Sequence, residues 1–434
     1  MARLNMQRRT FMKWMAAAPL LAQVSLQKAL GKGWAQTERL STDNIYTRLG
    51  VKTMINGRGV WTYTGASLEL PEVLAAQEAA AKHFVNIFEL QHAVGRRLAE
   101  LTGAESGMIT SGAAGAIASG TAACIAGSDP ERIWQLPDTT GMKSEVVMMG
   151  GRSAFDSAIR LAGGKLVVVE SHEQLANALN SNTAMIYTIS DMTNSTTEFD
   201  TLAKELAIAK RAGVPLFMDS ADGVPPVEKM NRFAKMGCDL FTVSGGKGLC
   251  GPQCSGVLLG RKDLIEAALY NTNPWEGAVC RPMKVGKEEI LGCLAAVETW
   301  YKTDLSAMDK EWHGRVERIA KLVETVPGIS TSIETPTGSN CYPTLTIIWD
   351  QIEWGYTSED CARDLINGTP SIAVVTDDNP SGVLGRIKRP GKRPENEIRN
   401  DQLQIVSMTL QPGEEIIVGR RLRQLLSAAR QRKA

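Results

Sequence analysis

The sequence predicts an α/β protein, with a large domain built on a parallel sheet and a smaller α+β domain at the C-terminal end. In the middle of the chain, short apolar segments without polar alternation indicate strands that are covered on both faces. Helical patterns separate these segments, as right-handed crossovers between parallel strands require. After about residue 284, long helical patterns prevail. The length of 434 residues is sufficient for two or three domains.

The first part of the chain is expected to be an extended arm with turns over residues 44–64. A helical spacing of apolar residues then extends over 71–101, and Pro71 suits the first turn of a helix. A short strand over 105–110 precedes a helix of small residues that ends near Ile125.

The middle of the chain is predicted to alternate between strands and helices. The predicted strands are 145–149, 165–169, 184–189, 215–219, 240–243 and 257–260, and the predicted helices are 155–161, 173–179, 201–211 and 262–270. In the C-terminal part we expect helices over 287–300, 309–326, 358–365 and 413–426, strands over 342–349 and 404–409, and a loop over 377–399. The predicted division is residues 1–35, a signal peptide; 36–95, an arm and helix; 96–283, the large domain; and 284–434, the small domain.

Lys247 is the most informative residue, because it stands among glycines in Ser244-Gly245-Gly246-Lys247-Gly248 and follows a predicted strand that ends at Asp219. A buried aspartate followed some thirty residues later by such a lysine is typical of proteins that bind pyridoxal 5'-phosphate (PLP). The lysine amine forms a Schiff base with the cofactor aldehyde, and the aspartate keeps the pyridine nitrogen protonated. Glycines beside the lysine allow the backbone to approach the cofactor closely.

The segment Ser111-Gly112-Ala113 is the candidate phosphate cradle, because it joins a predicted strand to a helix start. Free N–H groups and the helix dipole at such a start favour an anion. Small residues there also serve tight packing, so this signal depends on the Asp219 and Lys247 pair downstream.

Composition limits the partners that the chain is expected to have. A net charge of +1 gives no global field, which argues against nucleic acid as the main partner. The eight cysteines lack the spacing of a metal site, so no metal is predicted. No apolar run long enough to span a bilayer follows the N-terminal segment, so no stable membrane span is predicted.

The N-terminal segment Arg8-Arg9-Thr10-Phe11-Met12-Lys13 resembles a bacterial twin-arginine export signal. A short apolar stretch follows, and Gly33-Trp34-Ala35 offers small residues at a suitable cleavage spacing. We therefore expect recognition by the twin-arginine machinery and a periplasmic location. A basic amphipathic helix that belongs to the fold is the alternative interpretation.

Several motifs together resemble the fold-type-I, aspartate aminotransferase-like PLP proteins related to bacterial selenocysteine synthase, and within them the D-glucosaminate-6-phosphate ammonia-lyase-like proteins. The motifs are Asp219-Ser220-Ala221, residues 244–253, Arg281-Pro282-Met283-Lys284-Val285-Gly286-Lys287-Glu288-Glu289 and Leu410-Gln411-Pro412-Gly413. The resemblance covers nearly all of the chain after residue 42. It implies a homodimer or larger homo-oligomer and a small-molecule amino substrate.

The resemblance also implies roles for individual residues. Lys247 and Asp219 would be catalytic and bind the cofactor, Ala221 would pack against one face of its ring, and Ser244 would lie beside it. Ser111, Gly112 and Ala113 would hold the phosphate. Arg281 and Lys284 would bind a substrate or cofactor anion, with a solvated turn as the alternative.

The sequence departs from the family pattern in two places. Gly151 stands where relatives often carry a histidine, and Ser220 and Asp222 flank Ala221 where relatives tend to have Asp-Ala-Ala. The function we expect is a PLP-dependent lyase of the β-elimination or ammonia-lyase type, acting on a small amino acid or amino sugar acid through Lys247. The alternatives are a selenocysteine synthase-like PLP transferase and an exported PLP-fold binding protein without catalysis.

Overall fold

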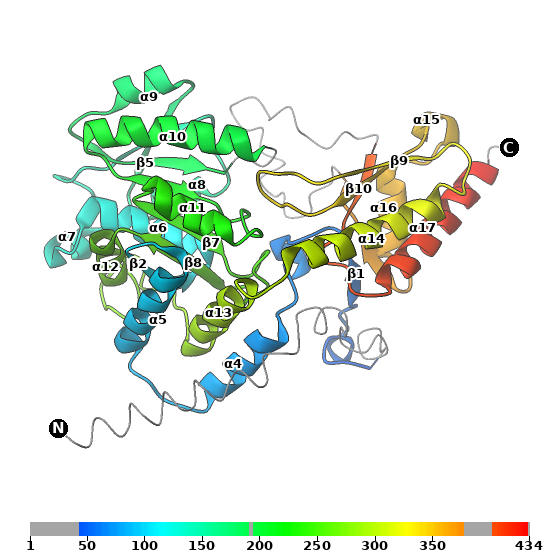
Figure 1. Ribbon diagram of the computed structural model, residues 1–434, viewed down its shortest axis with the longest axis horizontal. Coiled ribbons are helices and arrows are strands. Elements are labelled where there is room, and N and C mark those ends of the chain that lie inside the picture. The colour runs from blue at the N-terminus through cyan, green and yellow to red at the C-terminus, as the bar shows by residue number, and fades with distance from the viewer. Residues whose placement is uncertain (1–42, 191–193, 377–401, 433–434) are drawn as a thin grey trace.

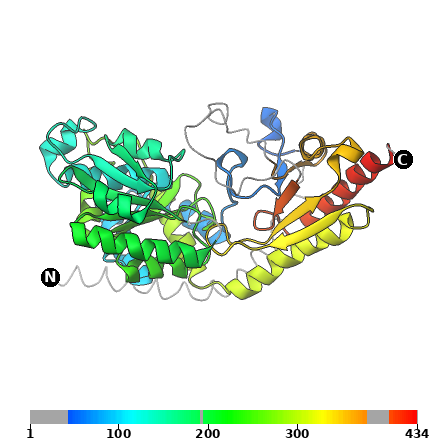
Figure 2. The same cartoon turned by 90° about the horizontal axis from the view of Figure 1, so that it is seen from above.

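The computed structural model describes residues 43–190, 194–376 and 402–432. Two lobes lie side by side (Figures 1 and 2). The large lobe is built from the middle of the chain, and the small lobe is built mainly from its C-terminal part. The expected signal segment and the expected loop over 377–399 lie outside the described residues. Within the described ranges, no helix combines the length and the apolar character that crossing a membrane requires.

A seven-stranded sheet forms the centre of the large lobe, with the strand order β2-β8-β7-β6-β5-β3-β4. The strands are β2 (Ser106–Ser111), β3 (Glu145–Met149), β4 (Lys165–Val169), β5 (Thr183–Ile189), β6 (Leu216–Asp219), β7 (Leu240–Ser244) and β8 (Ser255–Gly260). The sheet is not parallel throughout, because β8 runs antiparallel to both β2 and β7. A parallel connection needs a crossover of about a dozen residues or more, and the segment 245–254 between β7 and β8 forms a tight loop instead.

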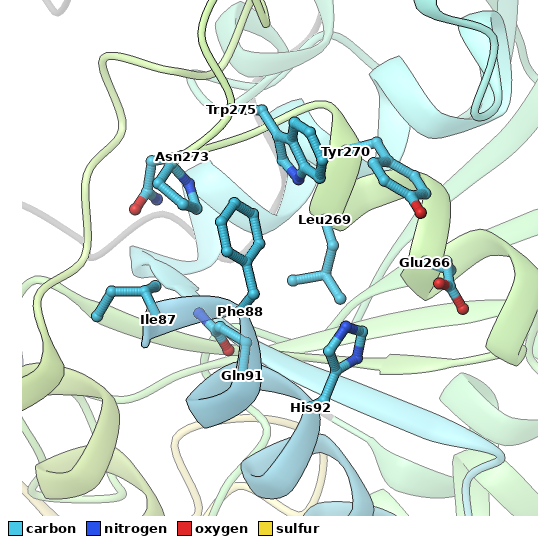
Figure 3. A pocket seen from close by; sticks show the side chains of 10 residues that line it. Ile87, Phe88, Gln91, His92, Glu266, Leu269, Tyr270, Asn273 and Trp275 are labelled. Carbon is cyan, nitrogen blue, oxygen red and sulfur yellow. The ribbon is translucent and has the colours of Figure 1, made fainter. Parts of the chain in front are cut away.

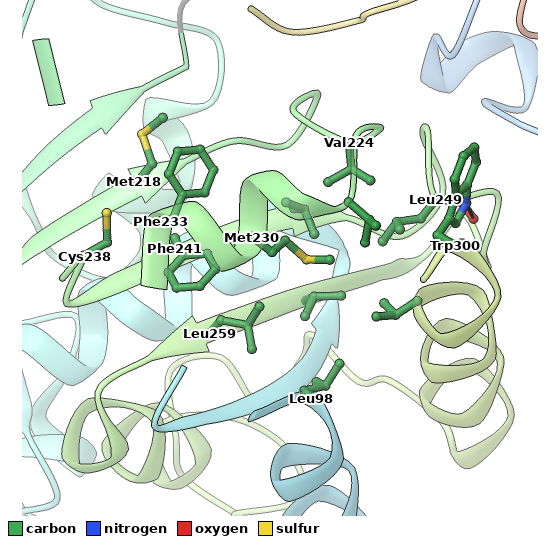
Figure 4. Close-up of a cluster of buried hydrophobic side chains, with 14 of the residues drawn as sticks. Leu98, Met218, Val224, Met230, Phe233, Cys238, Phe241, Leu249, Leu259 and Trp300 are labelled. Carbon is green, nitrogen blue, oxygen red and sulfur yellow. Dashed lines mark hydrogen bonds between the residues drawn. The ribbon is translucent and has the colours of Figure 1, made fainter. Parts of the chain in front are cut away.

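Helices cover both faces of this sheet, so its strands are apolar on both sides. On one face lie α6 (Gly112–Ala126), α8 (Asp156–Leu161) and α12 (Lys262–Tyr270), whose apolar residues join one buried cluster with the strands. The other face packs against α5 (Ile87–Thr102), α9 (His172–Ala178), α10 (Ser195–Ala212) and α11 (Glu228–Met236). Neighbouring strand residues point to opposite clusters, as Ile186 and Tyr187 do. Figure 4 shows part of the second cluster, with Phe233, Phe241 and Met230 between α11 and the sheet.

The helical pattern over 71–101 forms two helices rather than one, α4 (Pro71–Ala81) and α5. The break has a local cause, because the side chain of Asn86 accepts hydrogen bonds from the backbone N–H groups of Phe88 and Glu89 and so caps a new helix. Helix α4 packs with α13 (Lys287–Trp300). The short helix α7 (Pro130–Gln135) and helix α11 were not predicted from the sequence.

The small lobe contains an antiparallel sheet of order β12-β10-β9 and a parallel pair of β1 and β11. Its elements are β1 (Met54–Asn56), α14 (Leu305–Val323), β9 (Ser330–Glu334), β10 (Thr344–Ile348), α15 (Gln351–Trp354), α16 (Ser358–Ile366), β11 (Ser371–Ala373), β12 (Gln402–Val406) and α17 (Glu414–Gln431). The buried cluster of the large lobe includes Trp300, Met308 and Trp312, whereas Val316 and the residues after it on α14 join the cluster of the small lobe. Helix α14 therefore contributes to both cores.

Candidate active site

Lys247 lies in the loop that joins β7 to β8, and its side chain is 19% exposed. The backbone on both sides of the lysine is closely packed. A Cβ atom at Gly246 would lie 2.3 Å from the Cα of Gln253, and one at Gly248 would lie 1.8 Å from the carbonyl oxygen of Val224. A larger residue at either position would displace the backbone, so the two glycines fix where Lys247 stands.

The N-terminal arm lies against this loop. The N–H and the hydroxyl of Ser67 both donate to the carbonyl of Gly246, at 3.2 and 2.8 Å. The side-chain amide of Gln253 donates to the carbonyl of Thr62 at 2.9 Å. The same arm pairs with the small lobe through β1, so it connects the Lys247 loop to the C-terminal part of the chain.

Asp219 is the last residue of β6 and is 3% exposed. The Tyr187 hydroxyl donates to its Oδ2 at 2.6 Å, and the Ala221 N–H donates to its Oδ1 at 3.1 Å. Burial raises the pKa of the Asp219 carboxyl, while these two donors and the charge of Lys247 act in the opposite direction. Burial also raises the pKa of Tyr187, so its phenol remains a hydrogen-bond donor.

The turn from β2 into α6 has the geometry of an anion cradle. Ser111 ends β2, and α6 starts at Gly112, whose φ of 71° is in the left-handed region that favours glycine. No side-chain cap occupies the N-terminal N–H groups of α6. Gly256 on β8 allows this turn to pack closely, because a Cβ there would lie 2.6 Å from the Ala113 nitrogen. The cradle thus presents backbone donors from a helix of 15 residues.

Ser244 and Ala221 are brought together at the ends of β7 and β6, where the Ser244 N–H donates to the Ala221 carbonyl at 3.2 Å. Arg281 and Lys284 lie in the turn before α13, with Arg281 half-buried and Lys284 exposed. Within the described ranges, the side chain of neither residue makes a hydrogen bond or ion pair. Their turn lies near the start of α6, since a Cβ at Gly115 would be 3.9 Å from the sulfur of Met283.

Two residues lie close to the Lys247 amine although no role was predicted for them. The Oδ1 of Asp222 is 2.6 Å from the Lys247 Nζ. The Phe155 ring, at the start of α8, has its centroid 5.8 Å from the same nitrogen, within the range of a cation–π contact. Asp222 was noted only as a departure from the family pattern. Phe155 comes a few residues after Gly151, the position where relatives often carry a histidine. An aromatic residue so close to that position was the signal by which the sequence could have indicated Phe155.

Comparison with known proteins gives a consistent result. Residues 167–354 match the family described as Aminotransferase class-V. The chain is 30% identical over 341 residues to a D-glucosaminate-6-phosphate ammonia lyase of Salmonella typhimurium, a match that covers 76% of this chain and 89% of the relative. It is 29% identical to a 5'-C-glycyluridine monooxygenase-decarboxylase of a Streptomyces species, over 75% of this chain and 83% of the relative.

The solved structures agree with these relatives. A structure of D-glucosaminate-6-phosphate ammonia-lyase superposes with a TM-score of 0.73 at 27% identity, and the match covers 89% of this chain and 99% of that one. The chain belongs to this family of fold-type-I PLP-dependent enzymes. Serine palmitoyltransferase of Sphingomonas wittichii, at 13% identity and a TM-score of 0.51, shares the fold alone. The similarity to the ammonia lyase confirms the expected fold class, the PLP cofactor and the lyase type of enzyme.

The described residues fit PLP on geometric grounds. A buried carboxylate at the end of β6, an accessible lysine amine on the next loop and free backbone donors at the start of α6 supply the three groups that the cofactor needs. Gly256 places no side chain against this turn, where a Cβ would lie 2.6 Å from the Ala113 nitrogen. The roles of Lys247, Asp219, Ala221, Ser244 and the cradle residues remain predictions. Their positions in the structure are consistent with those roles.

A separate surface cavity of about 210 Å³ lies between α5 and α12 (Figure 3). Phe88, His92, Tyr270 and Trp275 contribute to its lining, and the side chains converge from the two helices and the segment after α12. None of the predicted cofactor residues lines it. The cavity is therefore distinct from the site around Lys247.

Proposed function

We propose that the protein is a PLP-dependent ammonia-lyase that acts on an amino sugar acid or a related small amino acid. The observation that carries this proposal is the similarity to the ammonia lyase of Salmonella typhimurium over 89% of that enzyme. The arrangement of Lys247 and Asp219 supports it, because a lyase that removes a Cα proton needs a base and a stabilised electron sink.

In this proposal Lys247 has two tasks. Its Nζ would hold PLP and, once released by the substrate amine, would take the proton from the substrate Cα. PLP, when bound, supplies the electron sink for the pair left on that carbon. Asp219 would hold a proton on the ring nitrogen, and its Oδ2 accepts a hydrogen bond from the Tyr187 hydroxyl. A β-hydroxyl leaves as water, and hydrolysis yields a keto acid and ammonia.

The substrate would be held by groups at the mouth of the site. Arg281 and Lys284 are cationic side chains without a partner among the described residues, and they precede α13 close to the start of α6. A substrate that carries an anionic group, such as a sugar acid or its phosphate, suits them. Phe155 would lie beside the cofactor, because its ring centroid is 5.8 Å from the Lys247 Nζ.

The first experiment combines labelling with product analysis. Borohydride reduction of the PLP-loaded protein and peptide mapping should place a pyridoxyl group on Lys247, and Lys247→Ala should lose it. Lys262→Ala, which changes an exposed lysine of α12, serves as the matched control and should keep the label on Lys247. Label on another lysine in the unsubstituted protein contradicts the assignment.

The labelled protein should then be offered amino acids and amino sugar acids, with ammonia, keto acid, carbon dioxide and oxygen uptake measured together. Ammonia and keto acid without oxygen uptake are the expected products. Oxygen consumption with release of carbon dioxide would instead favour chemistry like that named for the Streptomyces relative.

The selenocysteine synthase-like alternative has less support. The chain is 28% identical to an L-seryl-tRNA(Sec) selenium transferase of Hyphomonas neptunium, but the match covers 54% of this chain and 53% of that enzyme. The similarity to lyases also speaks against the alternative of a binding protein without catalysis.

We further propose that the enzyme is a homodimer or a larger homo-oligomer. Symmetric assembly is the default for soluble oligomers. Phe88 is 39% exposed and Trp275 is 40% exposed, and both line the cavity between α5 and α12, so an apolar surface is available for a second copy. Light scattering that shows an active monomer at working concentration would contradict this.

Periplasmic location by the twin-arginine route is likewise a proposal, supported by the Arg8-Arg9 motif in register with Phe11 and Lys13. Changing both arginines to lysine preserves charge but removes the motif, so the doubly substituted precursor should stay in the cytoplasm. Fractionation that finds the unsubstituted protein wholly cytoplasmic with residues 1–35 intact would show that the segment is not an export signal.

A further inference from the structure

The carboxylate of Asp222 contacts the lysine that the proposed function assigns to PLP. Its Oδ1 lies 2.6 Å from the Lys247 Nζ, with 26% of the Asp222 side chain and 19% of the Lys247 side chain exposed. A partly exposed ion pair contributes little to stability, on the order of 1 kcal/mol or less. The significance of this pair therefore comes from its position. It involves the Lys247 Nζ, the atom expected to bind the cofactor and to move a proton.

The pair is built from rigid backbone on both sides. Asp222 lies in a turn closed by the Gly223 N–H, which donates to the Ser220 carbonyl at 2.9 Å. A Cβ at Gly223 would lie 1.9 Å from the Ser220 Oγ, so a larger residue there would require the Ser220 side chain to move. The carbonyl of Asp222 also accepts from the Asn340 N–H at 2.9 Å, which joins the turn to the small lobe. The contact with Lys247 is thus held by packing on both sides.

The charged and titratable groups around Asp222 come from three segments. Lys247 belongs to the loop after β7, and Asp219 ends β6. The phenol of Tyr342 belongs to the small lobe and donates to the Val224 carbonyl at 3.2 Å. Burial raises the pKa of both Asp219 and Tyr342, and the charge of Asp222 acts in the same direction on each. The Phe155 ring also lies near the lysine nitrogen, with its centroid 5.8 Å away.

We propose that Asp222 is a positioning residue that holds positive charge on the Lys247 nitrogen. In the resting enzyme it would keep that nitrogen protonated while PLP is attached. During turnover it would stabilise the ammonium that Lys247 becomes on taking the Cα proton. This inference rests on the proposed function, because it requires Lys247 to be the PLP lysine.

The proton balance is simple. The Cα–H bond of the substrate breaks, and its proton forms a bond to Nζ. The electron pair of that bond, stabilised by the electron sink, forms the Cα–Cβ double bond as the bond between Cβ and the hydroxyl breaks. The Nζ proton then passes to that hydroxyl, which leaves as water, and Lys247 is neutral again. Asp222 remains a carboxylate throughout, so it acts by charge and position and not by giving up a proton of its own.

The rival interpretation is an ion pair with no effect on the loaded enzyme. The two interpretations differ in the pH titration of the visible absorbance band of PLP-loaded protein, which reports protonation at the Lys247 nitrogen. The variant Asp222→Asn keeps the shape of the side chain and removes its charge, and Asp222→Glu keeps the charge. Asp263→Asn is the matched control, because it removes an exposed carboxylate of α12 that pairs with Arg261 at 2.6 Å.

In Asp222→Asn the titration midpoint should fall by about one pH unit or more, as loss of a nearby opposite charge predicts. Asp222→Glu should recover at least half of that change, and Asp263→Asn should match the unsubstituted protein. The rate constant for Cα deuterium exchange at saturating substrate should fall about tenfold to a hundredfold in Asp222→Asn, with a smaller change in KM.

A midpoint in Asp222→Asn equal to that of the unsubstituted protein overturns the inference. So does failure of Asp222→Asn to fold, because it would assign the pair a structural role. Borohydride mapping on each variant separates this inference from the proposed function. Label on Lys247 with an unchanged midpoint overturns only the role of Asp222, whereas label on a different lysine in the unsubstituted protein overturns the proposed function itself.

Discussion

Asp219 and Asp222 are separated by two residues, yet their surroundings are opposite. Asp219 ends a central strand, is 3% exposed, and accepts hydrogen bonds from Tyr187 and Ala221. Asp222 stands in the following turn, where its carboxylate is partly open to solvent and faces Lys247. The same side chain is therefore suited to a buried carboxylate at the end of a strand in one case and to an ion pair with the Lys247 amine in the other.

The largest effect is expected from Asp219→Asn, which removes the buried charge but keeps the shape. Cα deprotonation should fall about a hundredfold or more, because the ring nitrogen is no longer held protonated. Deuterium exchange into substrate and PLP content measure this, with Asp263→Asn as the matched control. PLP should be partly retained. Unchanged exchange would show that Asp219 has no electronic role.

Tyr187→Phe tests whether the environment of Asp219 depends on its phenol donor. The change removes a hydrogen bond to a charged group, typically worth about 1.5–3 kcal/mol, so exchange should fall about tenfold or somewhat more. The Asp219 pKa should rise further, because burial would act with less opposition. Tyr301→Phe is the control, since it removes a phenol that donates to Asn231 at 2.7 Å away from Asp219. Equal losses in both variants would indicate a general packing defect.

Glu205 extends the comparison to a buried carboxyl outside the site. It is 1% exposed on α10, and burial raises its pKa from 4.5 to about 7 despite a hydrogen bond with Thr188. Burial of Glu205 therefore favours its protonated form in the folded protein. The contribution of this form to stability is fully present below the unfolded pKa near 4.5, and it is lost as pH rises through the folded pKa of about 7.

Glu205→Gln cannot ionise, so its advantage in free energy of unfolding should grow from pH 5 to pH 8. The upper limit is about 3 kcal/mol, because a pKa difference of one between the folded and unfolded chains corresponds to about 1.4 kcal/mol. Urea unfolding at pH 5 and pH 8 measures this difference in free energy. Glu205→Gln should change activity less than Asp219→Asn or Tyr187→Phe. Glu173→Gln, an exposed glutamate of α9, should show no such growth. A constant difference across this pH range would mean that Glu205 stays ionised.

Much of the fold could be predicted from local patterns. The bounds of β3, β4, α12 and α13 agree with the predicted ranges, because each is a single apolar or amphipathic run with clear ends. The direction of β8 and the short elements α7, β9 and β11 were missed. These depend on which neighbour a segment pairs with, and a segment of three to six residues carries little periodicity.

The sequence by itself indicated the cofactor and the candidates Lys247 and Asp219, because a glycine-bounded lysine and a strand-ending carboxylate are local features. It indicated the family through a resemblance carried by several motifs. Tertiary structure alone placed Tyr187 on Asp219, and Asp222 and Phe155 on Lys247. Tyr187 comes from β5 and Phe155 from the segment before α8, so both reach the site only when parallel strands align their carboxyl ends. Contacts of this kind depend on the register of separate strands, and no spacing along the chain records that register.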